Sequence, residues 1–202
     1  MNASNTPGRC PSEALSKRVL AVLAPGPRPP DALWPDLEKA FGTIDFKGDF
    51  HAFGHTGYYR DEFGDGLHRG FISFRGLMDP SGLADFKRET ADLEAAWSKG
   101  GRRSVNLDAG YLDADKLVLA SMKRGPGKLY LRDGAYADFL LRYANGRFEP
   151  LPWAFPDFQD GRYHKSLLAI RGKLKSEMRH GREGEVSPAD QAQPTSPPPG
   201  TP

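Results

Sequence analysis

The sequence has 202 residues, with 28 Lys and Arg against 26 Asp and Glu, so its formal net charge at neutral pH is only +2. The chain therefore has no overall charge asymmetry that would require nucleic acid as a partner. The single cysteine, Cys10, excludes a disulfide framework and a zinc site built from cysteines, which fits a reducing cytoplasm. No apolar run approaches about 18 residues and the N-terminus lacks an apolar signal core, so we expect a cytoplasmic protein without a membrane span.

The composition predicts one folded domain between two tails. We expect residues 1–17 to form a disordered N-terminal tail, residues 18–180 a single α+β domain, and residues 181–202 a disordered, proline-rich tail. The segment between the tails is long enough and apolar enough to bury a sizeable core.

The domain is predicted to begin with an apolar strand, Arg18–Ala24, which runs into a proline-rich connector that cannot be helical. A helix follows, because Leu33, Leu37 and Phe41 share one face and Gly42 can end it. A strand followed by a helix suggests a nucleotide-binding loop, but the connector has neither the phosphate-loop pattern nor the glycine pattern of a dinucleotide site. The sequence therefore argues against both kinds of nucleotide site.

The segment after this helix is dense in polar and aromatic residues. His51 and His55 lie four residues apart among carboxylates, a set that could bind a divalent metal, but their spacing matches no specific metal motif. The simpler interpretation is a loop whose histidines are exposed or hydrogen-bonded. The candidate site residues of this segment are three that could line a pocket: Thr56, Tyr58 and Tyr59.

A second strand, Leu67–Phe74, precedes the clearest helix of the sequence, which begins at Asp79-Pro80 with a capping residue and a first-turn proline. Its apolar residues recur at steps of three and four and predict a buried face: Leu83, Phe86, Thr90, Leu93 and Trp97. Its charged residues predict a solvated face: Lys87, Arg88, Glu89, Asp92 and Glu94. We therefore expect this helix to be core scaffolding.

The middle of the chain carries the main candidate site. We expect a short strand, Ser104–Leu107, then a polar turn, then a helix opened by Asp113 whose apolar run is buried on all sides. Functional sites often lie at such a strand-to-helix turn, so Asn106, Asp108 and Tyr111 are candidate site residues. The alternative is that the two shorter side chains only satisfy backbone amides of the turn.

Residues 128–151 predict a three-stranded antiparallel meander, because Asp133-Gly134 and Asn145-Gly146 are strong hairpin turns. Alternation predicts one apolar face of its middle strand: Ala137, Phe139, Leu141 and Tyr143. It places Tyr136, Asp138 and Arg142 on the other face, beside Lys128, Tyr130 and Arg132 of the first strand, so that this face gathers basic and tyrosine side chains. Such a face could hold a phosphate or a single-stranded nucleic acid, although an ordinary solvated sheet face explains the same pattern.

The last predicted helix, Tyr163–Met178, has one apolar side and one basic side. This pattern fits contact with a membrane surface or a nucleic acid, and it also fits a helix docked on the domain with a solvated face. The segment before it, Glu149–Asp160, contains prolines that restrict its backbone, so we expect it to lie extended against the domain.

Four segments resemble a bacterial family known as domain of unknown function 4416: Phe53–Tyr59 (FGHTGYY), Val105–Leu112 (VNLDAGYL), Lys116–Lys123 (KLVLASMK) and Leu151–Phe158 (LPWAFPDF). The resemblance extends from about Val19 to Leu174 and implies no known activity. Relative to the pattern expected for the family, one proline, one threonine and two tyrosines are replaced: Ala109, Ala154, Phe155 and Phe158. The polar positions of the pattern are kept at Thr56, Tyr58, Tyr59, Asn106, Asp108, Tyr111, Lys116 and Asp157. Some members are called GTP-binding proteins, a name that the missing phosphate loop does not support here.

These features predict an α+β fold: a single domain with a mixed sheet, a C-terminal antiparallel meander and helices packed mainly on one face. For function, the first hypothesis is a small-ligand protein, with or without enzymatic activity, that acts on a phosphorylated or nucleotide-like compound at the turn Asn106–Tyr111. Asp108 would be its acid/base or metal-holding carboxylate. The groups that would bind the anionic small molecule are Thr56, Tyr58, Tyr59, Asn106, Tyr111, Lys116 or Lys123, and Arg132.

The second hypothesis is a module without chemistry that binds RNA or a protein through the basic meander face and the last helix. A divalent metal is compatible with the first hypothesis, although no motif indicates one. The sequence indicates no oligomeric state.

Overall fold

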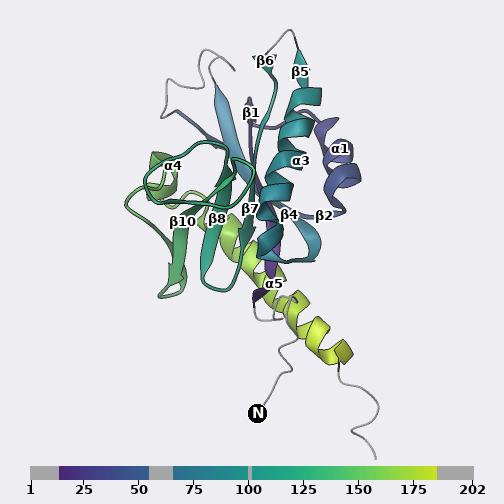
Figure 1. The fold of residues 1–202 in the computed structure, drawn as a ribbon, viewed down its shortest axis with the longest axis vertical. Coiled ribbons are helices and arrows are strands. Elements are labelled where there is room, and N and C mark those ends of the chain that lie inside the picture. Colours follow the sequence, from purple (N-terminus) through teal and green to yellow (C-terminus); the bar gives the residue numbers. More distant parts are fainter. Residues whose placement is uncertain (1–13, 55–65, 100–101, 186–202) are drawn as a thin grey trace, which may run out of the picture.

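The computed structural model describes residues 14–54, 66–99 and 102–185, which form a large sheet with helices packed on it (Figure 1). The main sheet contains nine strands: β1 (Ser16–Pro25), β2 (Ile44–Lys47), β3 (His51–Ala52), β4 (Leu67–Met78), β7 (Asn106–Leu112), β8 (Lys116–Ser121), β9 (Lys128–Tyr130), β10 (Tyr136–Ala144) and β11 (Arg147–Pro150). A small separate hairpin pairs β5 (Ser98–Lys99) with β6 (Arg102–Arg103). The helices are α1 (Leu33–Phe41), a 3-10 turn η3 (Pro80–Gly82), α3 (Leu83–Ala96), α4 (Pro156–Gln159) and α5 (His164–Glu185).

The strands of the main sheet follow the order β11-β10-β8-β7-β1-β4-β2, with β3 beside β4 and β9 beside β10. The α+β class is confirmed. Each pair that the structure describes is antiparallel, where we expected a mixed sheet. The difference arises because the predicted strand-to-helix crossover in the middle of the chain is a hairpin, and a hairpin pairs its strands antiparallel.

That hairpin joins β7 and β8, so the helix predicted after Asp113 is wrong. The apolar run Leu117–Ala120 alternates between two cores: Leu117 and Leu119 pack in one, and Val118 and Ala120 pack in the other. A strand that is buried on both faces has a continuous run of apolar residues in its sequence. A buried helix has the same pattern, so periodicity does not distinguish the two. Asp113 tightens the turn, since its side chain accepts hydrogen bonds of 2.8 Å from two following backbone amides.

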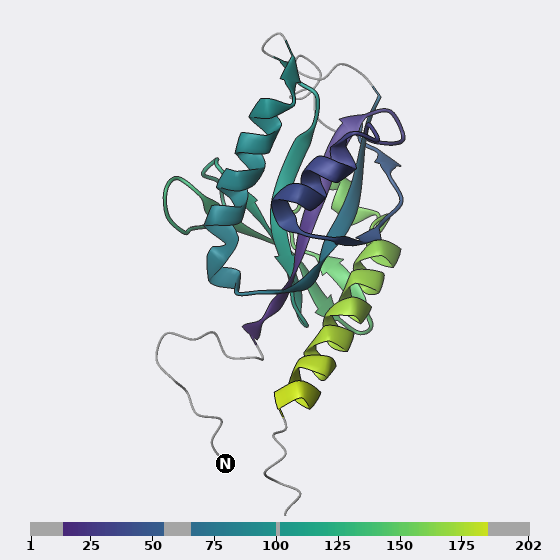
Figure 2. The same cartoon turned by 90° about the vertical axis from the view of Figure 1, so that its right-hand side faces the viewer.

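The helices cover both faces of the sheet rather than mainly one (Figure 2). α1 and α3 pack with Leu20 and Val22 of β1, while α4 and α5 pack with Val19 and Ala21 of the same strand. Every residue from Val19 to Ala24 is buried, so β1 is central and both of its faces require cover.

The C-terminal meander is confirmed, and its two turns form where the sequence predicts them. Asp133, Gly134, Asn145 and Gly146 all have φ between 52° and 79°, the left-handed conformation that two-residue hairpin turns of this kind require. The face assignment of β10 is wrong beyond its middle. The pairing of β10 with β8 shifts between Phe139 and Leu141, so one extra residue reverses the side-chain alternation that follows.

The helices predicted around Leu33–Phe41, after Asp79-Pro80 and over Tyr163–Met178 are confirmed as α1, α3 and α5, with shifted ends. α1 and α5 bury the faces that the sequence predicts.

The limits of the domain differ from the prediction at the N-terminal side. Ser16 and Lys17 were assigned to the disordered tail, but they lie in β1 and are fully buried. Lys17 is buried because its ammonium group pairs with Asp45 and Glu177. No helix of the described ranges is long and apolar enough to cross a membrane.

Candidate functional site

A cavity of about 520 Å³ opens where β7 and β8 separate. The two strands pair only at the turn end of the hairpin, up to Gly110 opposite Leu119. Gly110 permits this close approach, because a Cβ there would lie 2.4 Å from the Leu119 side chain and 2.6 Å from the Val118 carbonyl oxygen. Beyond Gly110, β7 stays with β1 and β8 stays with β10, so the gap between them is lined by side chains from both.

Helix α3 closes one side of this gap with two charged side chains. Glu94 Oε1 accepts a hydrogen bond of 2.6 Å from the Leu107 backbone amide, and Lys87 Nζ donates one of 3.0 Å to the Leu107 carbonyl oxygen. They therefore replace the strand partner that β7 lacks here. Lys87 and Glu94 were predicted to be solvated, and that prediction is wrong: both are buried because they satisfy this open strand edge.

Asp108 lies at the centre of the charged groups. Its two carboxylate oxygens lie 3.7 Å from Lys87 Nζ and 4.0 Å from Arg69 Nη2, so it stands between two buried cations. Asp108 keeps 23% of its side chain exposed and lines the cavity, whereas the two cations are almost fully buried. It is a strand residue rather than a turn residue, so capping of a turn does not explain its position.

Arg69 forms the wall behind Asp108. Its Nη1 lies 2.7 Å from Asp157 Oδ2, and that oxygen also accepts a hydrogen bond of 2.7 Å from the Tyr163 hydroxyl. Its guanidinium carbon lies 4.3 Å from the centre of the Phe53 ring, and two further rings flank it. Burial and the neighbouring Asp157 charge raise the pKa of Tyr163, so this hydroxyl stays a donor.

The opposite wall of the cavity carries a second carboxylate, Asp138 of β10. Lys128 Nζ lies 3.5 Å from Asp138 Oδ2, while Asp138 Oδ1 has no hydrogen-bond partner among the described residues. The amide nitrogen of Asn106 is likewise buried without an acceptor in the described part of the chain. Both side chains are at least nine-tenths buried and line the cavity. These two atoms are themselves shielded from solvent, although both residues contribute to the lining of the cavity.

Two of the cavity carboxyl groups have raised pKa values. Burial raises the pKa of Asp138, and the negative charge of Asp108 adds to this effect, while Lys128 opposes it. Burial also raises the pKa of Glu94, although Lys87 and Arg103 oppose the shift. A carboxyl group whose pKa is raised keeps its proton to a higher pH than an ordinary carboxyl group and is a candidate for proton transfer.

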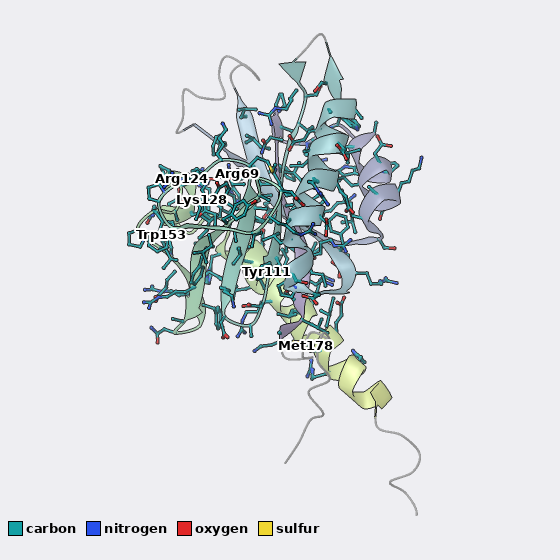
Figure 3. The ribbon with its side chains drawn as sticks, viewed as in Figure 1. Arg69, Tyr111, Arg124, Lys128, Trp153 and Met178 are labelled. Carbon is teal, nitrogen blue, oxygen red and sulfur yellow. The ribbon has the colours of Figure 1, made fainter. Side chains whose placement is uncertain are left out.

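The mouth of the cavity is basic. Lys123 and Arg124, which follow β8, are exposed there, and Phe155 and Met122 complete the rim. The cavity lining holds five cationic and three anionic side chains, so its formal charge is +2: Lys87, Arg103, Lys123, Arg124 and Lys128 against Glu94, Asp108 and Asp138. Figure 3 shows Arg124, Lys128 and Trp153 at one end of the sheet, with Tyr111 farther along it.

The structure brings some of the predicted site residues together and separates others. Asn106 and Asp108 line the cavity, and so do Lys123 and Lys128. Tyr111, Lys116 and Arg132 do not line it. Tyr111 packs against the core under α1 and α3, Lys116 pairs with Asp113 at the hairpin turn, and Arg132 pairs with Asp85 and Asp133 on the surface. Thr56, Tyr58 and Tyr59 lie outside the described residues.

Sequence reasoning missed several groups that the fold brings to the site: Arg69, Lys87, Glu94, Arg103, Asp138 and Phe155. Of these groups, only the two on α3 could have been recognised from the sequence pattern, because Lys87 and Glu94 lie seven residues apart on one face of the helix, beside the buried Thr90. The other groups come from separate strands and loops, and their meeting depends on the strand order. Within the described ranges, no group of three or more His, Cys, Asp or Glu side chains is arranged to hold a metal ion. His51 packs edge-on against Tyr163.

The comparisons identify a family. The model of the domain of unknown function DUF4416 matches residues 15–173. Because the match covers most of the chain, this protein belongs to the DUF4416 family. No curated protein and no solved structure matches the chain.

Proposed function

We propose that this protein binds a small phosphorylated compound in the cavity between β7 and β8. The observation that carries the proposal is a cavity of about 520 Å³ whose lining has a formal charge of +2 and whose mouth carries the exposed side chains of Lys123 and Arg124.

The charges of the cavity favour an anion. Lys123 and Arg124 stand exposed at the mouth, where a phosphate group can reach them while part of it stays hydrated. The carboxylates lie deeper, and two of them are buried beside cations. The phosphate therefore occupies the mouth, and the uncharged part of the ligand extends inward.

The inner part of the ligand carries at least one hydroxyl or similar group. Asn106 and Asp138 both contribute to the cavity lining, and a hydroxyl suits such a lining because it can accept from an amide and donate to a carboxylate. A cavity of about 520 Å³ accommodates a compound the size of a sugar phosphate or a mononucleotide.

The same carboxylates give the site a capacity for proton transfer. Asp108 faces the cavity beside Lys87, and Asp138 holds its proton more tightly because it is buried. A pair of carboxyl groups in different environments is the arrangement that general acid–base catalysis uses. If the protein is an enzyme, Asp108 acts as the base and Asp138 as the acid.

The test is a thermal-shift and calorimetric screen of the full chain against orthophosphate, glycerol 3-phosphate, ribose 5-phosphate and nucleoside monophosphates, with and without magnesium. A ligand at 100 times its dissociation constant should stabilise the protein by about 2.7 kcal/mol. Lys123→Gln should weaken the binding, whereas Lys39→Gln on the exposed surface of α1 is the matched control. No response to any of these compounds, or equal losses in the two variants, contradicts the proposal.

A further inference from the structure

The exposed apolar side chains of this protein gather beside the mouth of the cavity. Among the described residues, all the large hydrophobic side chains that are exposed belong to two short segments, 122–131 and 153–155. We call this set the apolar rim: Met122, Leu129, Tyr130, Leu131, Trp153 and Phe155. The two most exposed members, Leu129 and Tyr130, leave 70% and 62% of their surface open. Exposed apolar surface concentrated in one place indicates a binding surface.

The aromatic members of the apolar rim are held in place although they are exposed. Trp153 donates a hydrogen bond of 2.8 Å from its indole nitrogen to the Phe139 carbonyl oxygen. Its ring lies flat against Gly127, where a Cβ would approach the indole to 2.9 Å. The Tyr130 ring packs edge-on against Tyr136 at 5.4 Å between centres. Rings fixed in this way lose little conformational entropy when a partner stacks on them.

The chain segment that carries most of the apolar rim is basic. Residues 122–132 contain Lys123, Arg124, Lys128 and Arg132 and no acidic residue. Asp138 pairs with Lys128, and Asp85 and Asp133 pair with Arg132, so acidic residues of neighbouring segments offset part of this charge. The basic character of the segment itself disfavours a second copy of the chain as the partner, because identical basic surfaces repel each other. Exposed aromatic rings beside a basic stretch are the arrangement that binds single-stranded nucleic acid, whose bases stack while its phosphates meet the cations.

The apolar rim and the cavity are continuous. Met122 and Phe155 belong to both, and the basic residues Lys123 and Arg124, which directly follow Met122 in the chain, also line the cavity. Helix α3 contributes Lys87, Ala91 and Glu94 to the lining of the cavity. The shared residues place the cavity within reach of the end of a chain that lies along the rim.

We propose that the apolar rim binds single-stranded nucleic acid and that the cavity receives the terminal phosphate of that strand. The claim that the rim binds nucleic acid depends only on the residues of the rim. The claim that the cavity receives the terminal phosphate rests on the proposed function. Bases stack on Tyr130 and Trp153, Arg124 contacts the backbone phosphates, and Lys123 contacts the end phosphate. The ligand class of the cavity is then a nucleotide.

The experiment measures fluorescence anisotropy of a labelled oligouridylate of about 12 nucleotides with the full chain, at low and high salt. The expected affinity falls steeply with salt, as the release of counterions requires. Arg124→Glu should weaken binding about tenfold or more, while Arg75→Glu, the same charge reversal at an exposed position of β4, should leave it nearly unchanged.

A second pair of variants separates stacking from general apolar contact. Tyr130→Phe keeps the ring and should retain the affinity, whereas Tyr130→Leu keeps the apolar character without the ring and should lose about tenfold. Melting temperatures of both variants check that the fold is intact. Equal losses in the two variants overturn the stacking on Tyr130.

Oligonucleotides with and without an end phosphate distinguish binding on the apolar rim from binding of the terminal phosphate in the cavity. A 5′- or a 3′-phosphorylated oligonucleotide should bind more tightly than its unphosphorylated form, and Lys123→Gln should abolish that preference. Binding without a preference for an end phosphate refutes binding of the terminal phosphate in the cavity and leaves binding on the apolar rim standing. Absence of oligonucleotide binding, together with stabilisation by a small phosphate compound, refutes this inference and leaves the proposed function intact. Self-association that Leu129→Asp abolishes, without oligonucleotide binding, assigns the rim to a dimer instead.

Discussion

Two groups of buried charges in this protein differ in how closely their charges meet. At one end of the sheet, Lys17 Nζ lies 2.6 Å from Asp45 Oδ2 and also contacts Glu177. In the cavity, Asp108 stands 3.7 Å from Lys87 and makes no contact as short as that between Lys17 and Asp45. We call the first group the closed group, because Lys17 meets both of its carboxylates at hydrogen-bonding distance, although Glu177 Oε2 has no partner among the described residues. In the cavity, Asp108 leaves room between its charge and those of its cations.

The pKa values follow the same division. Although burial acts to raise it, hydrogen bonds from Lys17 and Ser73 lower the pKa of Asp45 below its ordinary value. Burial raises the pKa of Asp138 and of Glu94, and the cations beside them do not cancel this effect. Charges that match closely stabilise the ionised form and therefore the fold, whereas charges that match loosely around a cavity can still gain free energy from a ligand.

The largest effect on stability is expected at the closed group. Lys17→Met keeps most of the side-chain volume but removes the cation, which leaves the carboxylates of Asp45 and Glu177 without their shared partner. We expect the free energy of unfolding to fall by about 3 kcal/mol, measured by urea denaturation. Lys39→Met, at an exposed position of α1, should change it by less than about 0.5 kcal/mol. A loss below about 1 kcal/mol for Lys17→Met would remove the contrast between the two groups.

A smaller effect is expected for the corresponding lysine of the cavity. Lys87→Met removes the hydrogen bond to the Leu107 carbonyl oxygen, but Glu94 keeps Arg103 and the Leu107 amide, and Asp108 faces the open cavity. We expect a loss of about 1–2 kcal/mol in the same urea experiment. A loss equal to that of Lys17→Met would mean that the cavity charges are as closely matched as the closed group.

Asp108→Asn is expected to have little effect on stability. Both cationic partners of Asp108 lie at 3.7 Å or more, and the amide can keep polar contacts with the cavity, so the change should stay below about 1 kcal/mol. Binding of a phosphate compound should persist or strengthen, because a negative charge is removed, while any catalysed reaction should be lost. A loss of about 1–2 kcal/mol would instead indicate that Asp108 serves the fold.

The smallest effect is a change in pH dependence at Asp138. Because its folded pKa is raised, the folded state keeps a proton that the unfolded chain has lost, so this contribution to stability is complete below the ordinary value of 3.8 and is lost as pH rises through the folded pKa. Asp138→Asn cannot ionise, so its stability relative to the wild type should rise as pH increases from about 4 to about 7.

Glu149→Gln gives the opposite control for this pH series. Hydrogen bonds from Arg142 lower the pKa of Glu149, so its contribution is present above the ordinary value of 4.5 and is lost as pH falls. The relative stability of this variant should therefore decrease as pH rises. Equal slopes for the two variants, measured by thermal denaturation across the series, would contradict the assigned directions.

Local pattern was sufficient for the elements whose signals are local. The apolar strand β1, the helices α1, α3 and α5, and the meander with its turns Asp133-Gly134 and Asn145-Gly146 follow from periodicity and turn chemistry. The family was also evident from four short segments and is confirmed by the match over residues 15–173.

The sequence also pointed to two residues of the site, Asn106 and Asp108, but for the wrong reason. They were assigned to a strand-to-helix turn, and they lie on a strand beside a gap in the sheet. The run Leu117–Ala120 caused the error, because an apolar segment buried on both faces of a sheet has the same local pattern as a buried helix.

Only the tertiary structure decided the environment of that site. Lys87 and Glu94 lie on what reads as the solvated side of an amphipathic helix, and they are buried because β7 loses its strand partner beyond Gly110 and needs other hydrogen-bond partners. Arg69 meets Asp108 because β4 and β7 both flank β1, a relation between strands nearly forty residues apart in the chain. Periodicity reports which side of an element is apolar, whereas the partner of a charged side chain is set by the order in which distant strands pair.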